Sequence, residues 1–421
     1  MRKILHSDLN NFYASVECLL NPDIRDFPVV VCGRVEDRHG IVLAKNMIAK
    51  KAGIKTGMVL YEARGLCPNL KCVEAHHDIY AKYSKAVKDI YREYTDRVES
   101  FGIDEAWIDI TNCHKHGGDA YKIADEIRNR VKTEIGLTVS IGISFNKVFA
   151  KLGSDLKKPD AITEISVENY KDLVWPLPVE DLLFVGRKTQ KKLNSMNVKT
   201  IGDLAKFSKQ SLMFKFGKVG AMLHEYANGQ DSEIVHTKEE LDDIKSVGNS
   251  LTFYRDITTD QDVKALLILL SESVCKRMLS YGYKYANTVC LVIMTSELSH
   301  IIRTKKINAT NLAEDFANEA YKLFKKYFKW GMGYVVRGLG VSVSGFVNQK
   351  QMCFDDLNEK ADKKKNLQDA VENLRNRFGR NIINRAIIYT DKRMKNLNIV
   401  ADHTENIGRQ LKQSENSESA F

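Results

Sequence analysis

The first 165 residues alternate between short apolar runs and longer segments whose apolar positions recur at helical spacing. Apolar runs at 3–7, 27–32 and 137–143 predict strands, and the run 98–110 predicts another that carries carboxylates. The intervening segments predict helices over 11–20, 44–52, 77–98, 118–133 and 146–156. This alternation indicates an α/β or α+β unit.

The pattern changes twice further along the chain. From Pro176 to about Gly229, short helical segments separated by polar turns predict a small helical domain, and the polar stretch 230–246 predicts a linker. Residues 250–343 then predict the order strand, helix, strand, strand, helix, strand, which is typical of one sheet with two helices on one face. Beyond Gly345 we expect a polar tail, with one amphipathic segment around Leu374 and a disordered end.

Composition narrows the class of protein. A chain of 421 residues with 43% hydrophobic residues supports about two to four domains. It contains no run of about 18 apolar residues and no export signal, so we expect a cytoplasmic protein without a membrane span. Eight cysteines without a CxxC pair favour reduced thiols over disulfides or zinc. The net charge of +10 favours a polyanionic partner.

Two adjacent carboxylates, Asp104 and Glu105, interrupt the apolar run 98–110. Burying an unpaired charge costs several kcal/mol, roughly, so a cation must neutralise them, and hard oxygen ligands suit Mg²⁺. Asp8, at the end of another predicted strand, is a third candidate ligand. Side chains alternate along a strand, so both neighbours reach one site only if the backbone bends, which Gly102 permits. The alternative is that Asp8 caps the following helix and Glu105 pairs with a neighbouring one.

Three segments, in this order, resemble the motifs of the Y-family (translesion) DNA polymerases, and the likeness is nearest to the UmuC-like branch. Residues 8–17 are an acid followed by two aromatics and a helix ending in Val-Glu, 102–109 resemble the Asp-Glu hairpin, and 140–159 follow the third motif. The resemblance implies an α+β multidomain right-hand polymerase. The implied parts are a palm (1–20 and 76–165), small helical fingers (21–75), a thumb with a helix-hairpin-helix (166–232), a linker (233–246), a β-α-β-β-α-β little finger (247–346) and a partly disordered tail (347–421).

The resemblance also implies roles for single residues. Asp8, Asp104, Glu105 and the Leu9 carbonyl would hold two Mg²⁺ ions, with Mn²⁺ as a substitute, and Lys158 would contact the incoming triphosphate. Tyr13 would be the steric gate against ribonucleotides, while Phe12 packs under the nucleotide or in the core. In the fingers motif, Met47 and Lys50 stand where many members have Tyr and Arg; we expect Lys50 to contact phosphate.

Other residues are expected to hold DNA and a partner. Gly186 and Lys188 in the thumb, and Arg303, Lys305 and Lys306 in the little finger, would contact DNA phosphates. The peptide 349–354 resembles a sliding-clamp motif, with Gln349, Met352 and Phe354 as its anchors.

The function implied is a monomeric, template-directed DNA polymerase that adds dNTPs to a primer 3′-hydroxyl by two-metal phosphoryl transfer. Low fidelity without proofreading, and a role in damage tolerance or SOS mutagenesis, follow from the resemblance. Two alternatives are a palm-type nucleotidyl cyclase and a non-catalytic DNA-binding accessory protein. The cyclase leaves the duplex-binding features unexplained, and the accessory protein leaves the three carboxylates unexplained.

Overall fold

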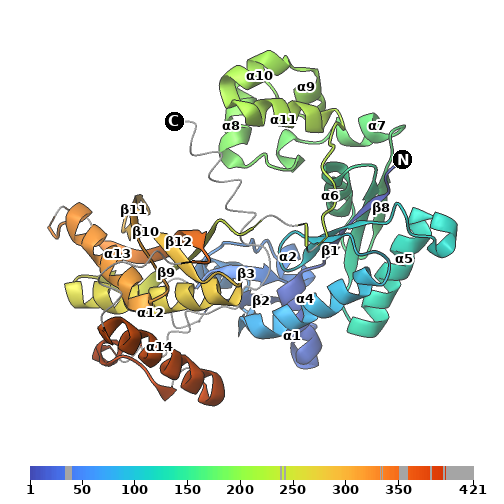
Figure 1. The fold of residues 1–421 in the computed structure, drawn as a ribbon. Helices are drawn as coiled ribbons and strands as arrows, with labels where there is room; N and C mark the ends of the chain where they lie inside the picture. The colour runs from blue at the N-terminus through green and yellow to red at the C-terminus, as the bar shows by residue number, and fades with distance from the viewer. Residues whose placement is uncertain are drawn as a thin grey trace. The chain divides into compact units, whose positions relative to one another are not determined.

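A computed structural model of the chain describes residues 1–33, 40–237, 239–240, 243–331, 333, 335–349, 359–379, 382–391 and 394 (Figure 1). These residues divide into an N-terminal unit, up to residue 242, and a C-terminal unit, residues 243–401. No helix within the described ranges is long and apolar enough to cross a bilayer.

A five-stranded sheet with the order β5-β6-β1-β7-β8 forms the centre of the N-terminal unit. Helices α4 and α5 cover one face, where Leu5, Ile108 and Ile141 enter a common core, and α6 packs on the other face. At Gly142 of the sheet, a β-carbon would lie 1.9 Å from the Ala150 carbonyl oxygen, so only glycine allows α6 this close. The bounds are β1 Ile4–Leu9, β5 Val98–Ser100, β6 Glu105–Asp109, β7 Val139–Ser144, β8 Ile162–Ile165, α1 Phe12–Leu20, α4 His77–Arg92, α5 Ala120–Arg130 and α6 Lys147–Leu156.

Residues 21–75, expected to be small and helical, also contain a three-stranded sheet of order β3-β2-β4. Its strands are β2 Val29–Cys32, β3 Val42–Lys45 and β4 Lys71–Glu74, and its helices are α2 Met47–Lys51 and α3 Leu60–Leu66. Asn46 starts α2, because its side-chain oxygen accepts a hydrogen bond from the Ala49 amide at 2.9 Å. Burial of Val30, Val42 and Leu60 gives this region a core of its own.

Short helices follow, as the sequence predicts: α7 Tyr170–Val174, α8 Arg187–Ser195, α9 Ile201–Lys206, α10 Lys209–Phe216 and α11 Lys218–Ala227. Leu193, Ile201 and Leu212 are fully buried between them. Thr200 and Asp203 form a reciprocal capping box at the start of α9, which satisfies two backbone amides there.

The beginning of the expected linker 233–246 is packed against the palm sheet. Val235 is fully buried beside Ile4 and Trp107, and the His236 amide donates to the Glu99 carboxylate at 2.9 Å. Arg97 donates to the Val235 carbonyl at 3.0 Å. We call residues 230–237 and 239–240 the strap. Its polar composition, which predicted a free linker, instead provides partners for charges inside the palm.

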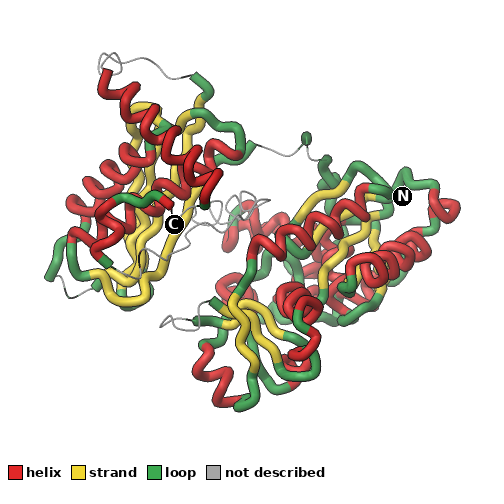
Figure 2. Tube along the Cα trace, turned by 90° about the horizontal axis from the view of Figure 1, so that it is seen from below, coloured by secondary structure: helices red, strands yellow, loops and turns green. Residues whose placement is uncertain are grey.

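The C-terminal unit has the predicted β-α-β-β-α-β order: β9 Ser246–Ile257, α12 Asp260–Ser280, β10 Tyr285–Thr295, β11 His300–Thr310, α13 Ala313–Tyr327 and β12 Val336–Val347. The strands form an antiparallel sheet of order β11-β10-β12-β9. Both helices lie on one face, and the strands run side by side behind them (Figure 2). This order confirms the predicted architecture of the unit.

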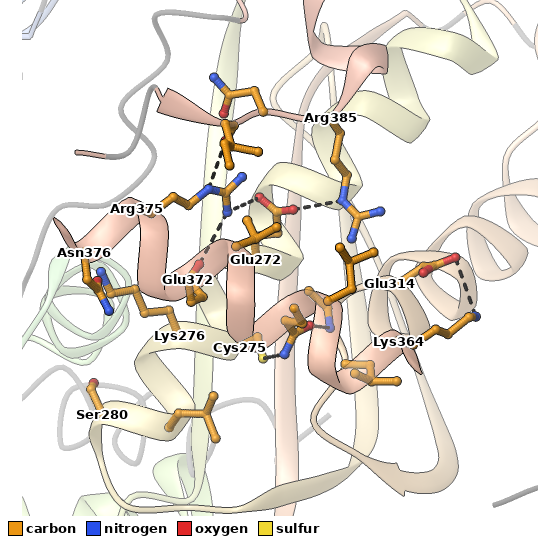
Figure 3. Close-up of a pocket in the computed structure, with 18 residues that line it drawn as sticks. Glu272, Cys275, Lys276, Ser280, Glu314, Lys364, Glu372, Arg375, Asn376 and Arg385 are labelled. Atoms are coloured by element: carbon orange, nitrogen blue, oxygen red, sulfur yellow. Dashed lines mark hydrogen bonds and ion pairs between the residues drawn. The ribbon is translucent and has the colours of Figure 1, made fainter. Parts of the chain in front are cut away.

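A further helix, α14 Glu359–Phe378, lies along α12 and encloses a cavity of about 430 Å³ with it (Figure 3). Arg375 contacts Glu272 at 3.1 Å, and the Gln368 side chain donates to the Asn311 carbonyl at 3.0 Å. The expected apolar face is only partly used, since Leu367 is 66% exposed and Phe378 is 62% exposed. The helix is therefore attached to the unit largely by polar contacts. The expected disordered end of the tail lies outside the described residues.

Candidate active site

Strand pairing brings together two of the three predicted acids, Asp8 and Glu105. In the antiparallel pair of β1 and β6, Asp8 lies directly opposite Glu105, so both side chains project from the same face of the sheet. Asp104 precedes β6 in the turn 101–104, where Gly102 has φ of +95°. The Asp104 carbonyl accepts a hydrogen bond from the Leu9 amide at 3.0 Å, which fixes Leu9 beside it. We call Asp8, Asp104 and Glu105 the acidic cluster.

The acidic cluster concentrates negative charge where Asp8 is buried and Asp104 and Glu105 are partly buried. Burial, and then the charges of Glu105 and Asp8, raise the pKa of Asp104 to about 6. Burial and the Glu105 charge also raise the pKa of Asp8. Among the residues that the structure describes, Asp104 makes no ion pair with a lysine, arginine or histidine. The cluster therefore carries more negative charge than its surroundings neutralise.

Two lysines lie on the cluster. Lys158 Nζ is 2.8 Å from Asp8 Oδ2. Lys151 Nζ, from α6, is 2.9 Å from Glu105 Oε2 and 3.7 Å from Asp8 Oδ2. Sequence reasoning found Lys158 but missed Lys151. The available signal was its position in the third motif, four residues before Asp155, with which it also pairs at 3.3 Å.

We tested whether the cluster suits a metal ion. Within the described ranges, no three His, Cys, Asp or Glu side chains are arranged as a ready metal site, and the two lysines contact the carboxylate oxygens instead. The donors themselves fit a divalent cation, because carboxylate oxygens are the ligands that Mg²⁺ prefers. Burial raises the pKa of Asp104 most, and the charges of Glu105 and Asp8 raise it further; a bound cation would compensate these like charges.

A buried histidine lies beneath Glu105. His6 is fully buried, its Nδ1 is 2.9 Å from Ser154 Oγ, and its Nε2 is 3.4 Å from Glu105 Oε2. Burial, assisted by the Lys151 charge, lowers the pKa of His6 well below its ordinary value. The ring is therefore neutral at physiological pH and adds no positive charge to the cluster.

The two aromatics of the first motif occupy different environments. Phe12 is 3% exposed and belongs to the palm core. Tyr13 stacks on Tyr80 with ring centroids 4.2 Å apart. Burial, and then the Asp104 charge, raise the pKa of Tyr13 to about 12. In the fingers region, Lys50 is exposed on α2 and, among the described residues, makes no ion pair.

The residues expected to contact DNA phosphates differ in their availability. Gly186 and Lys188 are exposed at the start of α8. Arg303 and Lys305 face the helices of the C-terminal unit, where Arg303 lies 4.8 Å over the Tyr327 ring and Lys305 pairs with Glu319 at 2.7 Å. Lys306 points to the other, open face of the sheet, opposite Thr288. The open face of the sheet thus presents Lys306, whereas Arg303 and Lys305 have partners on the helix side of the same unit.

The predicted clamp peptide falls mostly outside the described residues. Gln349 follows β12 directly, and Met352 and Phe354 lie in the range that the structure does not describe.

Comparisons with known proteins agree on one family. Residues 7–155 match the model of the impB/mucB/samB family, 244–355 match that family's C-terminal domain, and 180–231 match the thumb domain of DNA polymerase-iota. DNA polymerase IV of Acetivibrio thermocellus is 48% identical over 397 residues, which cover 93% of this chain and 98% of that protein. DNA polymerase IV of Moorella thermoacetica is 36% identical over 389 residues, 92% of this chain and 96% of that protein.

The fold also matches solved structures. A Y-family DNA polymerase chimera of Dbh and Dpo4 superposes with a TM-score of 0.71 at 24% sequence identity, over 82% of this chain and 99% of that chain. At this identity the likeness concerns the fold.

Proposed function

Since the chain belongs to the Y family of DNA polymerases and is a DNA-directed DNA polymerase, we propose that it extends a primer on template DNA at the acidic cluster. The observation that carries this assignment is the direct pairing of Asp8 with Glu105, with Asp104 electrostatically coupled to both. Hard oxygen donors in this arrangement suit phosphoryl transfer to a primer 3′-hydroxyl.

Each residue at the cluster has a part in this proposal. Asp8, Asp104, Glu105 and the Leu9 carbonyl would hold two Mg²⁺ ions, or Mn²⁺ in their place. When bound, such ions activate the primer hydroxyl and stabilise the leaving pyrophosphate. Lys158 binds the triphosphate of the incoming dNTP; its ammonium lies between Asp8 and Asp155, so phosphate oxygens offer it a further anionic partner. Lys50 contacts phosphate from the fingers.

We also propose how DNA and a partner are held. The exposed amide end of α8 at Gly186, with Lys188, contacts DNA phosphates without regard to sequence. Lys306 on the open face of the C-terminal sheet supplies a further phosphate contact. The peptide 349–354 binds a sliding clamp, and the enzyme works as a monomer. Low fidelity without proofreading, in damage tolerance of the SOS type, completes the proposal.

Primer extension tests the proposal against both alternatives. The wild-type protein, given primer-template DNA, dNTPs and Mg²⁺, is expected to extend the primer, and excess EDTA is expected to stop it. The reaction is followed on denaturing gels, with nucleotide products separated by chromatography. No extension by the wild type would contradict the proposal. Formation of a cyclic nucleotide from NTP alone would favour the cyclase, and DNA binding without either product would favour the accessory protein.

A separate prediction concerns the choice of sugar. Tyr13→Ala is expected to raise ribonucleotide incorporation relative to dNTP incorporation by at least tenfold, because removal of the ring opens the space beside the acidic cluster for a 2′-hydroxyl. The measurement is kcat/KM for matched rNTP and dNTP pairs. Tyr83→Ala, on the nearby helix α4, is the control for loss of an aromatic. Unchanged sugar selectivity in Tyr13→Ala would remove the gate assignment.

A further inference from the structure

Helix α4 contacts the segments on both sides of the acidic cluster through one polar stripe: two backbone carbonyls before Asp104 and the Ser7 side chain before Asp8. Lys88 Nζ donates to the Gly102 carbonyl at 2.9 Å, and Ser84 Oγ donates to the Ile103 carbonyl. Tyr91 OH lies 2.8 Å from Ser7 Oγ, next to Asp8. Positions 84, 88 and 91 are one helical turn apart in succession, so they share one face of α4.

The side chains of Ser84, Lys88 and Tyr91 are buried, although each ends in a hydrogen-bonding group. Ser84 is 5% exposed, Lys88 is 2% exposed and Tyr91 is 2% exposed. Placing an ammonium group in such a position is costly unless strong acceptors receive it. Nearby residues of the same helix, Val87 and Ile90, already fill the core. Packing alone therefore does not account for a lysine here.

Lys88 and Ser84 of the stripe bind the turn 101–104, which carries Asp104. The turn 101–104 contains Gly102 in the left-handed region, where glycine gives the chain wide freedom. Its closing backbone hydrogen bond runs from the Phe101 amide to the Glu105 carbonyl at 2.9 Å. Repulsion from Asp8 and Glu105 acts on Asp104 at the end of this turn. Besides the closing bond of the turn, the Leu9 amide holds the Asp104 carbonyl, so the hydrogen bonds from α4 to Gly102 and Ile103 add a further hold on the turn.

We propose that Ser84, Lys88 and Tyr91 are positioning residues for the polymerase reaction. They hold the carbonyls of Gly102 and Ile103, and the hydroxyl of Ser7, so that Asp104 and Asp8 keep the separation needed to bind divalent cations together. This inference rests on the proposed function of the acidic cluster. It places the control of that cluster on a helix that carries none of its carboxylates.

Three variants test the stripe with little change of volume. Ser84→Ala and Tyr91→Phe each remove one hydroxyl, and Lys88→Met removes the ammonium from a chain of similar length. Lys85→Met, an exposed position on the same helix, is the matched control. Mn²⁺ affinity is measured on the DNA-free protein by electron paramagnetic resonance, and kcat and KM for dNTP are measured by primer extension.

We expect Lys88→Met to weaken Mn²⁺ binding and lower kcat by about 10 to 100-fold, with smaller losses in the two hydroxyl variants. The dNTP KM and the DNA affinity should stay within about twofold, as should every value for Lys85→Met. Unchanged Mn²⁺ affinity in folded variants would overturn the proposal, even if thermal stability fell. If Lys88→Met does not fold, Ser84→Ala and Tyr91→Phe decide the question. If the wild type extends no primer, the proposed function fails, while the Mn²⁺ comparison still tests the positioning role.

Discussion

Asp104→Asn is expected to lower primer extension by at least about a thousandfold, equivalent to roughly 4 kcal/mol of transition-state stabilisation. The amide keeps the size of the side chain and its place in the turn 101–104, but it removes a negative charge from the acidic cluster. Single-turnover extension in Mg²⁺ measures the effect. Asp109→Asn, at the opposite end of β6, is the control and should extend primers at the wild-type rate. Activity within tenfold of wild type in Asp104→Asn would remove Asp104 from the reaction centre.

The same substitution should stabilise the metal-free protein. Burial, and then the charges of Glu105 and Asp8, raise the pKa of Asp104 from 3.8 to about 6; desolvation and repulsion together thus destabilise its charged form by up to about 3 kcal/mol at neutral pH. We expect Asp104→Asn in EDTA to raise the free energy of unfolding of the N-terminal unit by about 1–3 kcal/mol. An unchanged or lower stability would show that the carboxylate is not under electrostatic strain.

The sign of the pH dependence follows from the direction of that shift. The folded state binds a proton at Asp104 more tightly than the unfolded state does, so this group lowers stability as pH rises from about 4 to about 6. The stability difference between wild type and Asp104→Asn should therefore be small near pH 4 and reach its full value above pH 6. Denaturant unfolding in EDTA across this range provides the measurement.

The sequence predicts best what depends on local pattern. The order of elements in the C-terminal unit and the position of Asp8 at a strand end follow from periodicity, and the structure contains both. The pairing of Asp8 with Glu105 requires strand register, which periodicity does not give; the resemblance to a family implied only that the three acids share one site. Lys151 and Lys88 were missed because a lysine on a helix is usually solvated, and only tertiary packing shows them buried.

Two features of the structure could not be predicted from the sequence, for physical reasons. On the edge strand β11 seven of eleven residues are exposed, so hydrophobic alternation does not reveal which face each side chain takes. The structure places Arg303 and Lys305 on the helix side. The strap has two apolar residues among polar ones, Ile234 and Val235, and only Val235 is buried, beside residues distant in the sequence. A short segment of sequence determines neither the side that the β11 side chains take nor the burial of Val235.

The buried charges of Glu99 and Lys147 give the largest effect on stability that we expect. Glu99 of β5 is completely buried and accepts from Lys147 Nζ at 2.9 Å. Its other oxygen accepts from the His236 amide of the strap at 2.9 Å. Lys147 is itself 2% exposed and also pairs with Glu233 of the strap at 3.2 Å. One buried carboxylate thus joins the palm sheet, helix α6 and the strap.

Glu99→Ala should cost about 3–5 kcal/mol of stability in the N-terminal unit, because it leaves the Lys147 ammonium buried without its main partner. Lys147→Met should cost a similar amount, because the buried Glu99 carboxylate then loses the ammonium that balances its charge and keeps its contacts to His236. Glu99→Leu combined with Lys147→Met should cost less than the sum of the two single changes, since neither charge then remains buried. Asp89→Asn, which breaks the exposed pair with Arg92, is the control and should change stability by less than about 1 kcal/mol.

Limited proteolysis separates loss of the strap from general unfolding. In Glu99→Ala, the strap loses the carboxylate that holds His236, so cleavage between 230 and 237 should become faster than cleavage within the palm. Denaturant unfolding followed by tryptophan fluorescence reports Trp107, which packs against Lys147. If both single variants lie within 1 kcal/mol of wild type and the strap stays protected, the buried pair is not what holds it. The strap would then be held by the burial of Val235 and by its contacts to Arg97.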